Sequence, residues 1–444
     1  MTKMKESGID WIGKIPEEWE VIKVKFFTYM KGRIGWQGLK ADEFIDEGPY
    51  LVTGTDFKNG RVNWDTAYHI SQKRYEQAPE IQLKQGDLLV TKDGTVGKLA
   101  LIDELPDSAS LNSHLLVLRP LFNRYDNHFL YYVLSSLEFK NYFQKVSIGS
   151  TMDSLSQEKM GEFIFALPNI NEQNSISRYL DKKTAQLDKA KALLEEQIQK
   201  LKDYRASLIY ETVTKGLDKT APLKDSGIDW IGQVPQGWEM VKFKYFFNTS
   251  KGLSITKECL VDDGIPVINY GQIHSSMSKQ VQSCDVRLPF VPDYYLSKKG
   301  ANLNQGDFVF ADTSEDLEGA GNFSTRIDST GPLLAGYHTI IARLNNYDEY
   351  DFRYFMHLFD SLAIRKQIQN KVSGIKVYSI TQGILNSIFV IIPPKSEQQK
   401  IANLLDEKTA QIDKLVQIKN QQIENINKQR QTLIYDYVTG KRRV

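Results

Sequence analysis

The chain has 444 residues, of which 41% are hydrophobic and 25% charged, and this composition predicts a globular protein of two to four domains. Its two cysteines, Cys259 and Cys284, exclude a disulfide scaffold and a multi-cysteine zinc site, and no apolar run is long enough for a membrane span or a secretion core, so we expect a cytoplasmic protein. The formal net charge of +1 excludes a strongly basic nucleic-acid binder; if the chain binds DNA, its cations are clustered or a partner supplies positive charge.

The chain opens with a segment that returns later. Residues 7–13 read Ser-Gly-Ile-Asp-Trp-Ile-Gly, and residues 226–232 read the same. Each copy is followed by a proline, a Trp-Glu pair, a Lys-x-Lys and two aromatic residues, so we define 7–27 and 226–247 as the two frame segments. Because their tryptophans belong to the repeated part, we predict that these side chains pack within the protein or dock a partner subunit. These tryptophans are Trp11, Trp19, Trp230 and Trp238.

The region after the first frame segment alternates between strand-like and helix-like runs. Apolar runs between turn residues predict strands at 49–52, 87–90, 114–118 and 163–167, and apolar residues at helical spacing predict helical structure over 127–143. Polar loops with glycines lie at 31–38, 92–98 and 147–152. This mixture predicts an α/β or α+β domain.

A long amphipathic helix follows, and it too is repeated. Neither 172–214 nor 397–439 contains proline or glycine, and the block at 181–189 returns nearly unchanged at 406–414. Apolar residues at heptad spacing predict two helices of roughly 40 residues, about 60 Å long each. The stripe consists of Leu180, Leu187, Leu194, Leu201 and Leu208 in the first helix and of Leu405, Ile412, Ile426 and Leu433 in the second, where Lys419 interrupts it.

The heptad stripe leaves two arrangements open. Homo-oligomeric coiled coils are a common use of such a pattern. Two copies in one chain, however, can cover each other's stripe without a second chain. We therefore predict that the two helices pack on each other and that a partner covers what remains exposed.

The region between the second frame segment and the second helix parallels the first middle region only faintly. Gln85-Gly86-Asp87 is matched by Gln305-Gly306-Asp307, and His114 by His338. Strands are predicted at 307–310 and 339–342 and helical structure over 351–368. We interpret the two histidines as structural, satisfied by hydrogen bonds, and a DNA contact is the alternative. A protein whose frame segments are alike while its middle regions differ is expected to recognise a different target with each middle region.

The sequence lacks a complete catalytic motif. Gly97-Lys98 is not a phosphate-binding loop, because Lys92 stands where the first glycine is needed and Leu99 where a Ser or Thr is needed. The Pro-Pro pair at 393–394 lacks the flanking residues of an adenine methyltransferase site, and the six histidines have no metal-ligand spacing. We predict that the chain is not an enzyme and has no metal or cofactor of its own.

Four motifs together carry a family resemblance. They are Ser-Gly-Ile-Asp-Trp-Ile-Gly-x-x-Pro-x-x-Trp-Glu from residue 7, Gly-Asp-Leu-Leu at 86–89, Pro-x-x-x-Glu-Gln at 168–173 and Lys-Thr-Ala-Gln-x-Asp-Lys at 183–189. In this order, and in tandem over essentially the whole chain, they resemble type I restriction–modification specificity subunits.

The resemblance implies an α+β (mixed α/β) fold with two pseudo-repeated target-recognition domains separated by two long antiparallel coiled-coil helices. It places the first recognition domain at 1–170, the first spacer helix at 171–216, the second recognition domain at 217–395 and the second helix at 396–440. Each domain would read one half of a split, asymmetric DNA site. The implied partners are double-stranded DNA, two adenine methylation subunits and two translocating nuclease subunits, which would use S-adenosylmethionine, ATP and Mg.

Candidate DNA contacts are cations, amides and aromatic side chains of the middle regions, because cations suit phosphates and guanine and amides suit adenine. In the first region they are Lys31, Arg33, Trp36, Gln37, Lys58, Arg61, Lys92 and Lys98. In the second they are Lys251, Lys257, Tyr270, Gln272, Lys376 and Tyr378.

Two other classes of protein fit parts of the sequence. A tandem coiled-coil scaffold would show the same heptads but no salt-dependent DNA binding in complex with a methyltransferase. A self-contained DNA methyltransferase or nuclease would need a cofactor site, and the purified chain would then bind S-adenosylmethionine alone.

Overall fold

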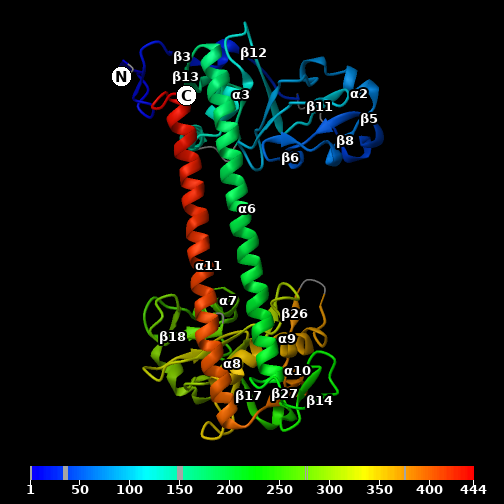
Figure 1. Ribbon diagram of the computed structural model, residues 1–444, viewed down its shortest axis with the longest axis vertical. Helices are drawn as coiled ribbons and strands as arrows, with labels where there is room; N and C mark the ends of the chain where they lie inside the picture. Colours follow the sequence, from blue (N-terminus) through cyan, green and yellow to red (C-terminus); the bar gives the residue numbers. More distant parts are fainter. Residues whose placement is uncertain (1–2, 34–38, 148–153, 276, 278, 375–376) are drawn as a thin grey trace. The chain divides into compact units, whose positions relative to one another are not determined.

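The computed structural model divides the chain into two compact units. Unit 1 comprises Met1–Glu195 and Asn420–Val444, and unit 2 comprises Glu196–Lys419 (Figure 1). Each unit therefore contains one frame segment, one middle region, the first part of one long helix and the last part of the other. The structure describes residues 3–33, 39–147, 154–275, 277, 279–374 and 377–444.

The described strands of unit 1 form two larger sheets and two small ones. The larger sheets have the orders β4-β12-β9-β10-β7-β6 and β11-β5-β8; β1 pairs with β2, and β3 pairs with β13. The predicted strands are therefore found. Their bounds are β1 (Met4–Glu6), β2 (Lys14–Pro16), β3 (Glu20–Lys23), β4 (Thr28–Lys31), β5 (Ile45–Val52), β6 (Phe57–Lys58), β7 (Arg61–Val62), β8 (Tyr68–His69), β9 (Leu88–Thr91), β10 (Leu99–Leu101), β11 (Ala109–Leu111), β12 (Leu115–Pro120) and β13 (Ile164–Leu167).

Unit 2 repeats this construction with different strand lengths. Its described strands form sheets of the orders β17-β25-β21-β23-β19 and β20-β18-β24, with the pairs β14-β15, β16-β27 and β22-β26. Their bounds are β14 (Leu223–Asp225), β15 (Gln233–Pro235), β16 (Glu239–Lys242), β17 (Phe247–Lys251), β18 (Ile265–Ile268), β19 (Lys279–Val281), β20 (Phe290–Val291), β21 (Phe308–Ala311), β22 (Thr313–Ser314), β23 (Phe323–Arg326), β24 (Leu334–Ala335), β25 (Thr339–Leu344), β26 (Tyr378–Ser379) and β27 (Phe389–Ile392).

The helices of the middle regions are shorter than predicted. The run over 127–143 is two helices that break at Ser135-Ser136, and the run over 351–368 breaks at Ser361. The Ser136 and Ser361 hydroxyls each donate to a carbonyl three residues back, at 2.6 Å, and so occupy the acceptor of the next helical hydrogen bond. The helices are α1 (Val24–Phe27), α2 (Gln72–Glu76), α3 (Asn127–Leu134), α4 (Leu137–Ser147), α5 (Gln157–Glu162), α7 (Tyr270–His274), α8 (Phe352–Asp360), α9 (Leu362–Gln369) and α10 (Gln382–Ser387).

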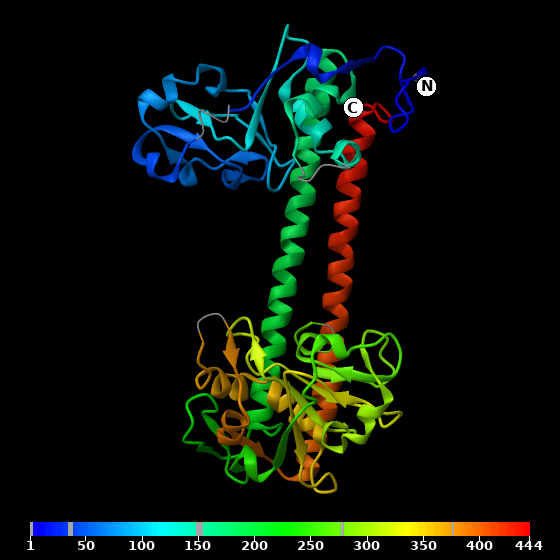
Figure 2. The ribbon, with the colours of Figure 1, turned by 180° about the vertical axis from the view of Figure 1, so that it is seen from behind.

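The two long helices are α6 (Ile170–Lys215) and α11 (Lys395–Val438), and they pack together in antiparallel directions (Figure 2). In unit 1 the Tyr179 and Tyr437 rings lie 4.6 Å apart, and Asp188 lies 3.6 Å from Arg430. In unit 2 Lys419 donates to Gln197 at 2.6 Å. The lysine that interrupts the stripe is therefore accommodated by a polar partner on the other helix.

The predicted stripe is buried unevenly. Leu180, Leu405 and Ile412 are 0%, 0% and 5% exposed, whereas the rest of the stripe is half-buried. Helix pairing in the chain thus covers the stripe mainly where a sheet domain also packs against it. The half-buried residues are Leu187, Leu194, Leu201, Leu208, Ile426 and Leu433.

The frame segment of unit 1 joins the two long helices to the sheet domain. The Trp19 side chain is fully buried, and its Nε1 donates to Glu172 Oε2 at the beginning of α6, at 3.1 Å. Beyond the end of α11, a Cβ on Gly440 would lie 2.4 Å from Pro16 and 3.3 Å from the Trp19 ring, and φ of this glycine is +69°. Only glycine fits this place.

Unit 2 has the same joint. Trp238 Nε1 donates to Glu397 Oε2 at 3.0 Å, and Gly216, which follows α6, approaches the Trp238 ring. Trp11 stacks on Phe163 with ring centroids 5.8 Å apart, whereas its counterpart Trp230 is 41% exposed. Three of the four frame tryptophans therefore pack within the fold.

We expect Leu405→Ala to lower the free energy of unfolding by about 2–5 kcal/mol, because the side chain is fully buried in the core of unit 2. Chemical denaturation of the full chain measures this. Leu415→Ala is the matched control, since Leu415 lies on the same helix and is 47% exposed; its effect should stay within about 0.5 kcal/mol. Equal effects of both variants would contradict this account of the stripe.

Candidate nucleic-acid interface

Strand pairing in unit 1 brings several candidate residues to one end of the larger sheet. Lys31 ends β4 opposite Val117, Lys92 follows β9, and Lys98 precedes β10. His114 directly precedes β12, whose first residue is opposite Thr91. Lys31 and Lys98 are exposed and Lys92 is half-buried. We call Lys31, Lys92, Lys98 and His114 the first strand-end edge.

The corresponding end of the sheet in unit 2 is built from the same strands. Lys251 ends β17, Asp312 follows β21 and His338 precedes β25, whose first residue is opposite Ala311. Tyr270 joins them, since its ring lies 5.4 Å from that of His338. We call Lys251, Tyr270, Asp312 and His338 the second strand-end edge.

The loops beside the two edges differ in charge. In unit 1, residues 92–98 contain Lys92 and Lys98 and a single carboxylate, Asp93. In unit 2, the loop that follows β22 carries Glu315, Asp316 and Glu318, all of them exposed. The two edges therefore offer different chemistry: one supplies mainly donors and positive charge, the other mainly acceptors.

Tyr378 and Gln272 lie near the second edge. Tyr378 is opposite Ser314 in the β22-β26 pair, two residues beyond Asp312. Gln272 accepts a hydrogen bond from the backbone N–H of Asn269 at 3.1 Å and thereby caps α7. Part of the Gln272 amide is therefore used within the fold.

A cavity of about 790 Å³ opens beside the second edge. In its wall, Arg365 donates to Asn322 Oδ1 at 3.0 Å, so the Asn322 amide donates to His274 Nδ1, also at 3.0 Å. His274 Nε2 then donates to the Thr313 carbonyl at 2.8 Å. In this chain of bonds His274 Nε2 is the donor and Nδ1 the acceptor.

Other candidate residues lie elsewhere or are used by the fold. Arg33 is 4% exposed, its guanidinium donates to Leu111 O and Ser110 Oγ at 3.0 Å, and burial lowers its pKa to about 10. Lys58 and Arg61 lie on the β6-β7 pair, where Arg61 is opposite Leu101 at the far end of β10 and pairs with Asp103. Lys257 is exposed in a 3₁₀ turn after β17. Three candidates fall outside the described residues: Trp36, Gln37 and Lys376.

Each sheet domain is fixed to the start of a long helix by two polar anchors. In unit 1 the fully buried Gln173 accepts from the backbone N–H of Asp126 at 2.9 Å. Asp181 accepts from His128 Nε2 at 2.9 Å and from the Tyr132 hydroxyl at 2.6 Å. Partial burial raises the pKa of Asp181, but these two bonds outweigh burial and leave the pKa below its ordinary value.

Unit 2 uses the same helix positions with other donors. Gln398 accepts from the backbone N–H of Asp351 at 3.0 Å, and Asp406 accepts from His357 at 2.7 Å and from Arg353 at 3.2 Å. The sequence signal for these anchors lies in the repeated motifs, which contain both the glutamines and the aspartates.

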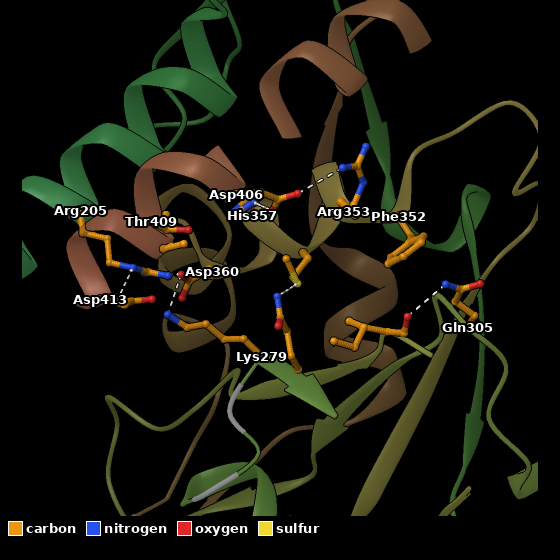
Figure 3. A pocket seen from close by; sticks show the side chains of 14 residues that line it. Arg205, Lys279, Gln305, Phe352, Arg353, His357, Asp360, Asp406, Thr409 and Asp413 are labelled. Atoms are coloured by element: carbon orange, nitrogen blue, oxygen red, sulfur yellow. Dashed lines mark hydrogen bonds and ion pairs between the residues drawn. The ribbon is translucent and has the colours of Figure 1, made fainter. Parts of the chain in front are cut away.

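Unit 2 adds a buried ion cluster to its anchors (Figure 3). Arg205 of α6 and Lys279 of β19 converge on Asp360 of α8, at 2.8 and 2.7 Å, and Asp413 lies 3.5 Å from Arg205. Burial alone raises the pKa of Asp360, but the charges of Lys279 and Arg205 outweigh it and hold the pKa below 3.8. Lys279 adopts a φ of +77°, a strained conformation for a residue with a side chain.

Only half of this cluster has a signal in the sequence. Arg205 and Arg430 repeat at the same offset as the helix motifs, and Arg430 lies 3.6 Å from Asp188 in unit 1. Lys279 and Asp360 stand alone in the sequence, and they meet only because the sheet and α8 pack on the long helices.

Two further findings concern the described part of the chain. Its His, Cys, Asp and Glu side chains form no group of three or more that could hold a metal ion. Its helices include none with the length and apolar character needed to cross a bilayer.

Comparison with known proteins gives consistent matches. The family described as type I restriction modification DNA specificity domain matches residues 16–202 and again 235–428. The putative type I restriction enzyme MjaX specificity subunit of Methanocaldococcus jannaschii is 24% identical over 98% of this chain and 96% of its own length. The type I restriction enzyme EcoKI specificity subunit of Escherichia coli is 23% identical over 97% and 90%.

Solved structures share the fold. A chain from work on complex assembly and conformational transition of the type I R-M system matches with a TM-score of 0.71 at 15% identity, over 96% of this chain and 99% of that chain. The HsdS subunit from Thermoanaerobacter tengcongensis matches with a TM-score of 0.50 at 13% identity, over 96% and 98%. At these identities the matches establish the mixed α+β architecture with two long packed helices.

We expect Asp360→Asn to lower the free energy of unfolding by about 3–5 kcal/mol at neutral pH, because Arg205 and Lys279 lose a buried counter-ion. The folded-state pKa of Asp360 is lowered, so its contribution is complete above 3.8 and is lost as the pH falls through the folded-state value. The difference between wild type and variant should therefore shrink in acid. Denaturation at several pH values measures this, with Asp262→Asn at an exposed position as the control; a difference independent of pH would contradict it.

Proposed function

Because this chain belongs to the type I restriction modification DNA specificity family, we propose that each of its two target-recognition domains reads one half of a split, asymmetric DNA site. The chain is the non-catalytic specificity subunit of a type I restriction–modification system. Sequence-specific binding by this chain would direct the reactions of the other subunits to that site.

The observation that carries the proposal is the pair of strand-end edges. Both units bring the same strand ends together, which suits two readers of one kind of ligand. The loops beside them differ in charge, with Lys92 and Lys98 in one and Glu315, Asp316 and Glu318 in the other. Because cations suit phosphates and guanine and carboxylates accept from cytosine, two edges of different chemistry favour two different half-sites.

We place the DNA contacts at these edges. In the first domain the candidates are Lys31, Lys92 and Lys98, and in the second Lys251, Tyr270 and Tyr378. Arg33 is left out, because its guanidinium is buried on the carbonyl of Leu111. The proposed recognition domains extend over 1–170 and 217–395, and the helices over 171–216 and 396–440 act as a spacer that sets the distance between half-sites.

The chemistry would come from partners. The chain is related to specificity subunits, and one fold relative was solved in work on complex assembly of a type I R-M system. We propose that two adenine methylation subunits use S-adenosylmethionine on DNA held by this chain, and that two translocase and nuclease subunits use ATP and Mg for restriction. We expect these reactions in the cytoplasm.

The first test is a map of modified bases in host DNA when the chain is expressed with its methylation subunit. We expect N6-methyladenine at one split, asymmetric motif, because two different half-site readers act on one duplex. Deletion of the gene for this chain should remove that methylation. An assembled complex that adds no methylation would contradict the proposal.

The second test exchanges one middle region. Replacement of residues 30–165 by another recognition domain should change one half of the methylated motif and leave the other half intact, because each half is read by one unit. The reciprocal exchange of 249–390 is the matched control and should change only the other half. A change in both halves after either exchange would refute the assignment of one domain to each half-site.

A further inference from the structure

Two histidines occupy the same structural place in both units. His114 and His338 directly precede β12 and β25, the central strands that pair with β9 and β21. The carbonyl of His114 accepts from Lys92 N at 2.8 Å, and the carbonyl of His338 accepts from Asp312 N at 3.1 Å. These bonds make the residues after β9 and β21 equivalent, so the two histidines correspond in space as well as in sequence.

A carboxylate lies beside each imidazole, and the one beside His338 is hydrogen-bonded to it. His114 Nδ1 lies 3.5 Å from Asp93, and His338 Nδ1 lies 3.1 Å from Asp312. The two aspartates are not equivalent, because Lys92 is the counterpart of Asp312 and Asp93 is the next residue. The histidine–aspartate pair is thus present in both units although its carboxylate comes from different positions.

Neither histidine is a buried structural residue. The side chains are 62% and 55% exposed. The His338 ring makes one hydrogen bond within the fold, to Asp312, so the structural interpretation and the DNA contact both stay predictions. With Nδ1 directed to an aspartate, Nε2 is the ring nitrogen left for a partner outside the chain.

The backbone at the second histidine is strained. His338 adopts a φ of +55°, in the left-handed region where glycine and asparagine are favoured. The neighbouring Tyr270 ring, 5.4 Å away, belongs to the same edge.

We propose that His114 and His338 each bind a DNA backbone phosphate, one in each half-site, as the contact that the two recognition domains share. This inference rests on the proposed function. Since the edges otherwise differ in charge, a residue common to both fits the part of DNA that is the same in every sequence, which is the sugar–phosphate backbone. A base contact would be expected to differ between two domains that read different half-sites.

The chemistry of the pair suits this role. A ring that carries a proton on both nitrogens directs Nδ1–H toward the aspartate and donates Nε2–H to a phosphate oxygen in a charge-assisted hydrogen bond. In unit 1 the neighbouring Lys31 and Lys92 support an anion at this place. In unit 2 the imidazole would be a main source of positive charge beside an acidic loop.

The test uses the complex of this chain with its methylation subunits and a DNA duplex that carries the mapped motif. We expect His114→Gln and His338→Gln each to weaken binding about tenfold, and to reduce the slope of log affinity against log salt by about 0.9, the value for one phosphate contact. The double variant should lose about twice this slope. The methylated motif should stay unchanged, because phosphate contacts carry no sequence information directly.

Two further variants separate this role from a general loss of structure. His114→Lys keeps a cation and should restore most of the slope. His69→Gln is the control, since its ring Nδ1 lies 2.7 Å from the Gly48 carbonyl in the other sheet of unit 1, and it should leave binding unchanged.

The outcomes are distinct. Unchanged affinity and slope in both glutamine variants, with an unchanged melting temperature, would overturn the phosphate contacts while leaving the proposed function intact. A change of the methylated motif at one base pair would overturn them in favour of a base contact. Absence of specific binding by the wild-type complex would instead count against the proposed function.

Discussion

The fold of each unit depends on one joint, at which a buried tryptophan of the frame segment holds the ends of two long helices. Trp19 donates to Glu172 at the beginning of α6 and packs against Gly440 after α11, and Trp238 does the same with Glu397 and Gly216. A heptad stripe favours the pairing of two helices but does not determine the residue at which the pair begins. The indole N–H fixes the beginning of one helix, and the close approach of a glycine fixes the end of the other. The repeat in the sequence is in this way converted into a repeat of structure, because the residues of both joints belong to repeated segments or directly follow them.

The anchors between sheet domain and helix explain how the middle regions can diverge on a constant frame. Gln173 and Gln398 accept from backbone N–H groups, so these bonds do not depend on the side chains of the domain. Asp181 and Asp406 accept from His and Tyr in one unit and from His and Arg in the other. A carboxylate has several acceptor sites and accepts any donor that reaches it. The helices therefore offer acceptors of low selectivity, and each middle region meets them with its own donors. The ion cluster around Asp360 adds a connection that is particular to unit 2.

The sequence predicts well those structural features whose residues repeat along the chain or recur with a regular period. The long helices follow from heptads and the central strands from apolar runs. The helix breaks at Ser136 and Ser361 do not, since each involves a serine hydroxyl that competes with the backbone. At the candidate interface, Lys31, Lys92 and Lys98 were identified as separate loop cations, and strand pairing gathers them. Arg33 has the same sequence character, yet it is buried by residues nearly eighty positions away. Tertiary packing decides whether a cation of this kind is buried or exposed, and a local sequence pattern does not show the outcome.

The small net charge of the chain is consistent with DNA binding once the pairing of its charges is considered. Arg119 and Arg343 each bind a buried aspartate, Asp87 and Asp307, which directly precede β9 and β21, and so contribute structure and little external field. The exposed lysines at the strand ends are few, and the loop beside the second edge is acidic. Such a surface attracts DNA only weakly at long range, since nonspecific affinity scales with the number of phosphates that are neutralised. Under the proposed function, short-range contacts at the two edges would carry a large share of the discrimination, and partner subunits would supply the remaining positive charge.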